Sequence, residues 1–107
     1  MAGIDYAELR VMIGIAQVLE LAGFLATETV GDQVRGPCPI HRSSSVSSRS
    51  FSANLSKNTF RCFKCGTSGN QLDLWMAVTQ LPIHEAAKDL CNRLGIEPPI
   101  VRRGEGW

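Results

Sequence analysis

The residues of this chain that are best suited to bind a metal ion occur as two closely spaced pairs. Cys38 and His41 form a Cys-x-x-His pair, and Cys62 and Cys65 form a later Cys-x-x-Cys pair. Thiolates and imidazoles are preferred ligands of Zn(II), and two tight turns that each present two ligands satisfy its tetrahedral coordination. Gly66 follows the second pair directly and can adopt the positive φ that such a turn often needs. The spacing therefore predicts a zinc site with Cys38, His41, Cys62 and Cys65 as its ligands.

This zinc site is predicted to be structural. Four protein ligands leave no coordination position for water or substrate, and closed sites of this kind are structural. A catalytic site of the deaminase type would require a His-x-Glu motif, whereas His84 and Glu85 are adjacent and far from the cysteine pairs in sequence. Zinc binding contributes on the order of 10 kcal/mol of folding free energy in small modules. We expect one structural Zn(II) per chain and no catalytic residues.

Two alternatives remain open for the Cys62 and Cys65 pair. A disulfide between them would close a tight, strained loop, and structural disulfides are uncommon in a reducing cell. A redox pair of the thioredoxin type normally opens a helix, whose N-terminus lowers the thiol pKa. Here Gly-Thr-Ser-Gly precedes any predicted helix. Cys91 lies on an apolar stripe and is expected in the core. His84 is expected at the surface, and it is the reserve ligand if His41 does not bind the metal.

Length and composition favour one intracellular domain. The chain has 107 residues, a net charge of +1 and four cysteines, and a length of this order fits a single domain. No apolar run approaches a membrane span, and the N-terminal residues lack the basic-then-apolar pattern of a signal peptide. A cytoplasmic protein without membrane contact is the expectation. Cysteines in that compartment favour metal binding or catalysis over cross-links.

The apolar periodicity predicts an α+β fold in which a small β region lies between helices. We expect a helix over 5–21 stopped by Gly23, strands over 24–30 and 33–36, a flexible serine-rich loop over 41–50 and a hairpin over 51–63 turning at 56–58. A helix is expected after Gly69, with Leu72, Trp75, Met76 and Thr79 on one face, and another over 82–94. The last helix carries an apolar stripe and ends at Gly95; its members are Ile83, Ala86, Ala87, Leu90, Cys91 and Leu94. Residues 1–97 are predicted to form the domain, and 98–107 a tail or linker.

Charge is distributed unevenly, and the β region is basic. The interval from 35 to 64 has no acidic residue, and its basic residues are Arg35, Arg42, Arg49, Lys57, Arg61 and Lys64. Phe51, Phe60 and Phe63 lie among them, although each aromatic alone is more often a core residue. Basic and aromatic side chains on a small sheet suit single-stranded nucleic acid, because bases stack and phosphates are neutralised. The serines, Asn54 and Asn58 are candidates for hydrogen bonds to phosphates or bases.

The motifs together resemble a known family. "CPIH", "SFS" and "FRCFKCGTSGNQLDLW" are similar to the Cys-His-Cys-Cys zinc-binding domain of bacterial DnaG-type DNA primases. The lead-in "GDQVRGPCPIH" and the closing "IHEAAKDLCNRLGI" match its flanks, so that the resemblance covers roughly residues 5–96. It implies an antiparallel zinc-ribbon sheet flanked by N-terminal and C-terminal helices, and the four ligands named above.

The resemblance also implies a function. In primases this domain helps to recognise the single-stranded DNA template and supports initiation of the RNA primer. Candidates for nucleic-acid contact are led by Arg49 and Lys64, and the full set is Arg42, Arg49, Lys57, Arg61, Phe63 and Lys64. A primase polymerase domain or a helicase is a possible protein partner.

The chain departs from the family in two places. The loop after His41 is rich in serine and longer than usual, and no Toprim-type cluster of acidic residues for polymerase metal ions is present. We therefore expect no nucleotide polymerisation by this chain alone, which is either part of a longer primase or a free-standing module. A zinc-ribbon adaptor acting with a polymerase, helicase or recombinase is the alternative function, and an oxidoreductase using Cys62 and Cys65 is a third.

Overall fold

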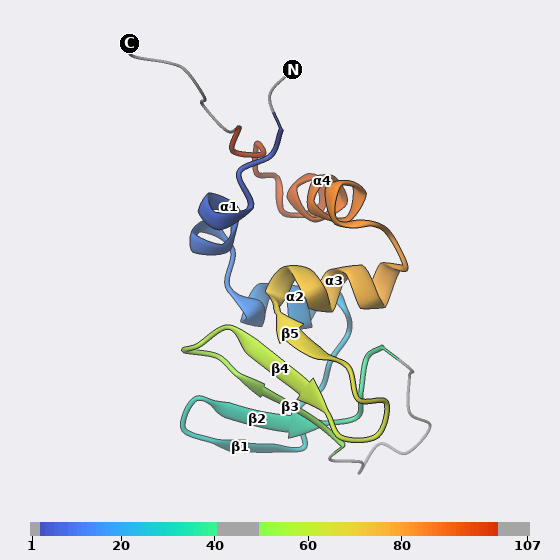
Figure 1. The fold of residues 1–107 in the computed structure, drawn as a ribbon. Coiled ribbons are helices and arrows are strands. Elements are labelled where there is room, and N and C mark those ends of the chain that lie inside the picture. The colour runs from blue at the N-terminus through green and yellow to red at the C-terminus, as the bar shows by residue number, and fades with distance from the viewer. Residues whose placement is uncertain (1–2, 41–49, 101–107) are drawn as a thin grey trace.

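The computed structural model describes residues 3–40 and 50–100. Three of the predicted site residues, His41, Arg42 and Arg49, lie outside the described residues, as does most of the predicted serine-rich loop. Each element below is labelled as in Figure 1.

The N-terminal segment forms two short helices, and the prediction of one helix over 5–21 is wrong. Helix α1 spans Tyr6–Met12 and helix α2 spans Ile15–Leu21. Between them Ile13 and Gly14 adopt extended backbone conformations. This break lets the side chains on both sides of it reach the interior: Leu9, Ile13 and Ile15 are all fully buried. The spacing of these side chains suggests a continuous helix, but burying them stabilises the protein more than the continuous helix would.

Five antiparallel strands form one sheet in which sequence neighbours are spatial neighbours. The strands are β1 (Glu28–Val30), β2 (Gln33–Gly36), β3 (Phe51–Asn54), β4 (Thr59–Cys62) and β5 (Ser68–Asn70). The predicted hairpin of β3 and β4 is confirmed, as is the pairing of β1 with β2, although β1 begins later than expected. Strand β5 was not predicted, because Ser-Gly-Asn has low β propensity. It forms because it pairs with β4.

Two further helices follow the sheet at the predicted places. Helix α3 spans Gln71–Thr79, and the Asn70 side chain caps its N-terminus by accepting hydrogen bonds from two backbone N–H groups. Helix α4 spans Ile83–Leu94 after Pro82 and ends at Gly95, which has a φ of 69°. The middle of its predicted stripe is buried, whereas Ile83 is 39% exposed.

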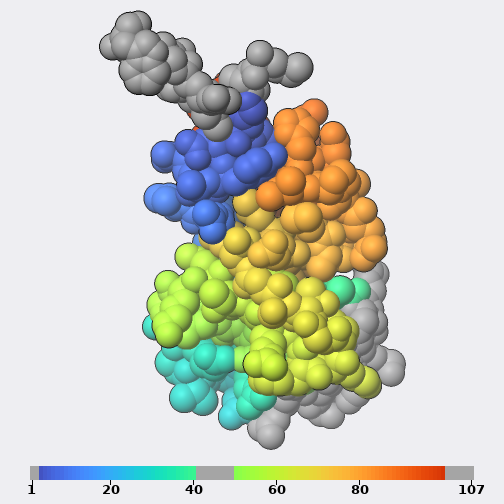
Figure 2. All heavy atoms as spheres, in the orientation of Figure 1, coloured from blue at the N-terminus to red at the C-terminus, as the bar shows by residue number. Residues whose placement is uncertain are grey.

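The helices and the sheet form separate layers. In Figure 1, α2 and α3 lie next to the sheet, and α1 and α4 lie farther from it; Figure 2 shows the same division in the packed atoms. Val34, Ala53 and Phe60 occupy consecutive positions across the sheet and are buried, so they form its core face. Alternate residues point the other way. We call this second surface the outer face; its residues on the three central strands are Gln33, Arg35, Ser52, Asn54, Thr59 and Arg61.

The two ends of the described chain meet on the side of the helices. The backbone N–H of Asp5 donates to the carbonyl of Pro99 at 2.8 Å, and Ile4 forms a β-bridge with Ile100. In Figure 1 the first and last described segments of the chain lie next to each other, at the end of the molecule farthest from the sheet. The domain boundary at 97 stays a prediction. Within the described residues, none of the helices has the length and apolar character needed to cross a membrane.

Candidate metal centre and outer face of the sheet

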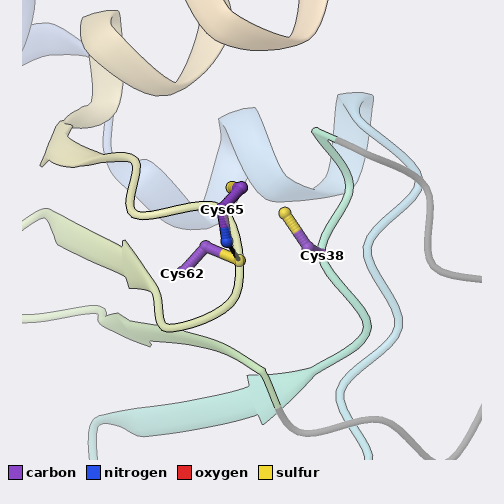
Figure 3. Close-up of side chains that lie close together, drawn as sticks. All are labelled: Cys38, Cys62 and Cys65. Atoms are coloured by element: carbon purple, nitrogen blue, oxygen red, sulfur yellow. Dashed lines mark hydrogen bonds between the residues drawn. The ribbon is translucent and has the colours of Figure 1, made fainter.

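Three of the four predicted ligands come together at one end of the sheet. The sulfur atoms of Cys38, Cys62 and Cys65 all lie within 4.8 Å of one another. Cys38 follows β2 across Pro37, Cys62 ends β4, and Cys65 lies in the turn that leads to β5. Figure 3 shows the Cys38 side chain pointing across to this turn. Residues far apart in sequence therefore share one site because β2, β3 and β4 are adjacent.

The turn after Cys62 has the hydrogen bonds of a metal-binding knuckle. The backbone N–H of Cys65 donates to the Cys62 sulfur at 3.4 Å, drawn as a dashed line in Figure 3. The N–H of Gly66 donates to the Cys62 carbonyl at 2.9 Å, and Gly66 has a φ of 75°, as predicted. The Cys62 N–H donates to the Thr67 carbonyl at 2.8 Å. Hydrogen bonds of this kind orient the side chains that bind a metal ion.

This cluster fits a zinc ion. Two sulfurs bound to one Zn(II) at about 2.3 Å in a tetrahedron lie about 3.8 Å apart, which the observed spacing accommodates. Cys38 and Cys62 are buried, and Cys65 is exposed. Three thiolates satisfy most of the tetrahedral coordination of zinc. The fourth predicted ligand, His41, lies outside the described residues, three positions after Cys38.

The remaining cysteine and histidine lie elsewhere, as predicted. Cys91 is 1% exposed on the core side of α4, and burial raises the pKa of its thiol. His84 is exposed near the start of α4. None of the four cysteines is in a disulfide. Cys62 ends β4 and Cys65 lies in the turn before β5, and neither is at the start of a helix. The geometry that activates a thioredoxin-type pair is therefore missing here.

The same knuckle places an aromatic ring on the outer face beside two arginines. Phe63, between the two cysteines, is 58% exposed. The guanidinium carbons of Arg61 and Arg35 lie 5.1 Å and 5.7 Å from the centre of its ring. Both distances are within the range of cation–π interactions. Arg35 and Arg61 are also neighbours across the sheet, because each is paired in register with Ser52.

Arg35 is a site residue that was not among the predicted contacts. Its Nε atom is buried and has no hydrogen-bond partner among the described residues. Because side chains alternate along strand β2, the sequence could have placed Arg35 on the face of the sheet opposite to that of the core residue Val34. Its position beside Phe63 could not be predicted, because it depends on the register of β2, β3 and β4.

A shallow hollow of about 290 Å³ lies on the outer face. It is lined by Gln33, Ser52, Asn54, Lys57, Thr59, Phe60, Arg61 and Phe63. Three of the predicted nucleic-acid contacts, Lys57, Arg61 and Phe63, thus surround one depression. Lys64 is exposed in the knuckle and does not line it. The hollow combines cations, an aromatic ring, amides and hydroxyls.

Other residues considered as contacts have structural roles. Phe51 is fully buried and Phe60 is 4% exposed, and their rings stack with centres 5.6 Å apart. The Asn54 side chain accepts hydrogen bonds from Ser56 and from the Lys57 N–H within the β3–β4 turn. The Asn58 side chain accepts from the N–H of Ile15. Of the three aromatics of the basic interval, only Phe63 remains available to a ligand.

A family model described as the CHC2 zinc finger, the zinc ribbon of DnaG, matches residues 4–105. The chain belongs to this family. A zinc finger agrees with the cysteine cluster of this chain, and a zinc ribbon agrees with its sheet. Zinc is the cofactor of the chain. The chain is therefore a zinc-binding domain of the DnaG primase type.

Individual relatives and a solved structure agree with this assignment. The DNA primase of Aquifex aeolicus is 34% identical over 91 residues, which cover 85% of this chain and 17% of that protein. The DNA primase of Geobacillus stearothermophilus is 31% identical over 84 residues, covering 78% of this chain and 14% of that protein. The crystal structure of the zinc-binding and RNA polymerase domains of the Aquifex aeolicus primase matches with a TM-score of 0.67 and 31% identity, covering 100% of this chain and 24% of that one. The chain thus spans less than a fifth of the length of these two curated relatives.

Proposed function

We propose that this chain binds single-stranded DNA template through the outer face of its sheet and supports primer synthesis carried out by a polymerase domain. The observation that carries the proposal is the exposed Phe63 ring, which lies beside Arg35 and Arg61 and lines a polar hollow. A base stacks on an exposed ring, and guanidinium groups beside it neutralise phosphates. The contact residues in this proposal are Arg35, Arg42, Arg49, Lys57, Arg61, Phe63 and Lys64.

In this proposal the zinc ion has a structural role. The ligands are Cys38, His41, Cys62 and Cys65, and the ion holds the knuckle that carries Phe63 and Lys64. Three thiolates and a neutral histidine give the zinc site a net charge of about −1, so the basic residues around it keep the region positive. The proposed domain comprises residues 1–97. It works in the cytoplasm with a primase polymerase domain or a helicase as its partner.

Binding of a fluorescein-labelled single-stranded oligonucleotide, followed by anisotropy over a range of salt concentrations, tests the proposal. If about four phosphates are neutralised, the log–log salt slope is about −3, from about −0.7 for each phosphate. Arg61→Ala and Phe63→Ala weaken binding about tenfold, because loss of a stacking contact costs about 1–3 kcal/mol. Lys88→Ala is the matched control, since Lys88 is an exposed cation on α4, away from the sheet.

Three outcomes would count against DNA binding. These are affinity that does not depend on salt, affinity unchanged by Arg49→Ala combined with Lys64→Ala, and equal losses for Arg61→Ala and Lys88→Ala. If no nucleic acid binds while a polymerase domain, helicase or recombinase from the same host co-purifies with the chain, the adaptor function replaces the proposal.

A further inference from the structure

The side chain of Asn58 connects the β3–β4 turn, at the edge of the outer face, to the helical layer. The Oδ1 atom of Asn58, in the β3–β4 turn, accepts a hydrogen bond from the backbone N–H of Ile15 at 2.9 Å. Ile15 is the first residue of α2, and the residue before it, Gly14, has no side chain that could cap the helix. The first N–H groups of a helix need acceptors from outside the helix. Asn58 therefore supplies a cap to α2 from a position 43 residues away in sequence.

The turn that contains Asn58 is fixed from several sides. Asn58 has a φ of 55°, a conformation that asparagine tolerates better than most residues. Within the turn, Asn54 Oδ1 accepts from the N–H groups of Ser56 and Lys57, each at 3.0 Å. The N–H of Leu55 donates to the carbonyl of Asp32 at 2.8 Å, in the neighbouring β1–β2 turn. Asn58 is the member of this turn whose side chain bonds to a helix.

Lys57, the residue before Asn58, is exposed and lines the hollow of the outer face. Its backbone N–H is held by Asn54 on one side, and the turn is held against α2 by Asn58 on the other. A lysine gains most from a phosphate contact when little conformational freedom is lost on binding. The Asn58 contact restricts the backbone of the turn before a ligand arrives.

We propose that Asn58 is a positioning residue for Lys57, and that DNA binding at Lys57 is coupled through Asn58 to the capping of α2. The inference rests on the proposed function, because it gives Lys57 a phosphate as its partner. Coupling of this kind is reciprocal. A turn held against α2 favours DNA binding, and bound DNA in turn protects the Ile15 amide from exchange with solvent.

A double-mutant cycle tests the first half of this coupling. Asn58→Gly keeps access to positive φ and removes the acceptor, and Lys57→Ala removes the phosphate contact. We expect Asn58→Gly to weaken binding of single-stranded oligo(dT) about threefold to tenfold in the wild-type background. In the Lys57→Ala background the same change should have less than a twofold effect, because its route to DNA has been removed. Zinc content and the CD spectrum establish that each variant is folded.

Amide exchange of Ile15, measured by NMR, tests the second half. We expect oligo(dT) to slow exchange of the Ile15 amide at least threefold in the wild-type protein and to have no effect on it in Lys57→Ala. Asn58→Asp keeps an oxygen acceptor, so it should preserve slow exchange in the free protein, whereas Asn58→Gly should accelerate it.

The outcomes separate this inference from the proposed function. A wild-type protein that binds no oligonucleotide contradicts the proposed function. Salt-dependent binding with equal Asn58→Gly losses in both backgrounds leaves the proposed function intact and overturns the inference, because Asn58 then acts only on general stability. Binding without any change at the Ile15 amide also overturns it.

Discussion

The side-chain amide of Gln71 donates a buried hydrogen bond to the carbonyl of Ile13 at 2.8 Å, and a second one to the carbonyl of Arg10 at 3.0 Å. Gln71 is 2% exposed and is the first residue of α3, directly after β5. Its two acceptors lie at the C-terminal end of α1, where helix carbonyls lose their helical partners. One glutamine thus joins the zinc-ribbon half of the chain to its N-terminal helices.

Gln71→Ala should lower the free energy of unfolding by about 1–3 kcal/mol, because it removes the Gln71 donor from the buried bond to Ile13 and from the partly buried bond to Arg10. Urea denaturation of the zinc-loaded protein, followed by tryptophan fluorescence, measures this change. Gln80→Ala is the matched control, since the Gln80 amide also donates to a helix carbonyl but is exposed. The control should change stability by less than about 0.5 kcal/mol. Equal effects of the two substitutions would show that the buried bonds contribute nothing.

A second network joins α3 to α4 and depends on pH. The Trp75 indole N–H and the Arg93 Nε–H both donate to Oδ2 of Asp89, at 3.0 Å and 2.8 Å. The bond from Arg93, aided by that from Trp75, holds the pKa of Asp89 below that of an ordinary aspartate. A lowered pKa stabilises the fold when the pH is above the pKa of the unfolded carboxyl group, about 3.9. This stabilisation is lost as the pH falls through the pKa of the folded state.

Asp89→Asn keeps an acceptor for Trp75 and removes the charge. We expect it to be about 0.5 kcal/mol less stable than wild type at pH 7, a magnitude typical of an exposed i,i+4 pair. The difference should disappear as the pH falls below about 3.9. Zinc is also released in acid as its ligands are protonated, so both proteins are compared at each pH and only their difference is interpreted. Glu97→Gln, which also removes one exposed carboxylate, is the control for the loss of a single negative charge. A difference that does not decrease at all between pH 7 and the acid range would contradict the assignment.

Sequence patterns predicted those parts of the molecule that depend on local chemistry. The cysteine spacing identified a cluster because each knuckle is a short turn, and three of the four ligand positions were found together. The β3–β4 hairpin and the ends of α4 followed from turn residues, from Pro82 and from Gly95. In these cases the signal and the structure lie within a few residues of each other.

The features that sequence patterns missed depend on contacts between distant segments. The break at Gly14 arises because residues on both sides of it are buried, and its new helix is capped from the β3–β4 turn. Strand β5 exists only as a partner of β4. Arg35 reaches Phe63 through strand register. Phe51 and Phe60 are buried in a core cluster that includes residues from far outside the basic interval. Of the three aromatics, Phe63 was the predicted contact, and it is the one that packing leaves exposed.

Cys91 should have no role in metal binding. It is buried among apolar residues of the core, and burial raises its thiol pKa. Cys91→Ala should lower the free energy of unfolding by about 1 kcal/mol. Cys91→Ser should lower it by about 1–3 kcal/mol more, because a hydroxyl buried without a hydrogen-bond partner destabilises the fold. Zinc content, measured by atomic absorption, should stay at one ion per chain in both. By contrast, Cys62→Ala should lose the ion. A loss of zinc in Cys91→Ala would place this thiol at the site.

The same burial predicts an alkaline pH dependence. A raised pKa contributes stability that is fully present below the pKa of the unfolded thiol, about 8.5, and is lost as the pH rises through the folded value. The stability advantage of wild type over Cys91→Ala should therefore shrink from pH 8 to pH 10. Thermal denaturation of both proteins at each pH measures it, and an advantage that is constant over this range would contradict a buried neutral thiol.

Zinc retention should also depend on Gly36, which is not a ligand. Gly36 ends β2, two residues before Cys38. A Cβ atom at this position would lie 2.7 Å from the backbone oxygen of Leu25 and 3.1 Å from the ring of Phe24. A backbone atom cannot rotate away as a side chain can, so Gly36→Ala must displace β2 or the segment before β1. Overpacking of this kind costs about 1–3 kcal/mol.

Because Cys38 follows β2 so closely, displacement of the strand should move its sulfur relative to Cys62 and Cys65. We expect Gly36→Ala to lower zinc affinity about tenfold, measured by competition with a chromogenic chelator. Gly3→Ala is the control, since a Cβ atom there meets nothing within 4 Å. Stability that falls while zinc affinity stays unchanged would mean that the sulfur cluster tolerates movement of β2. Equal zinc affinity and equal stability in both variants would mean that the contact with Leu25 relaxes at no cost.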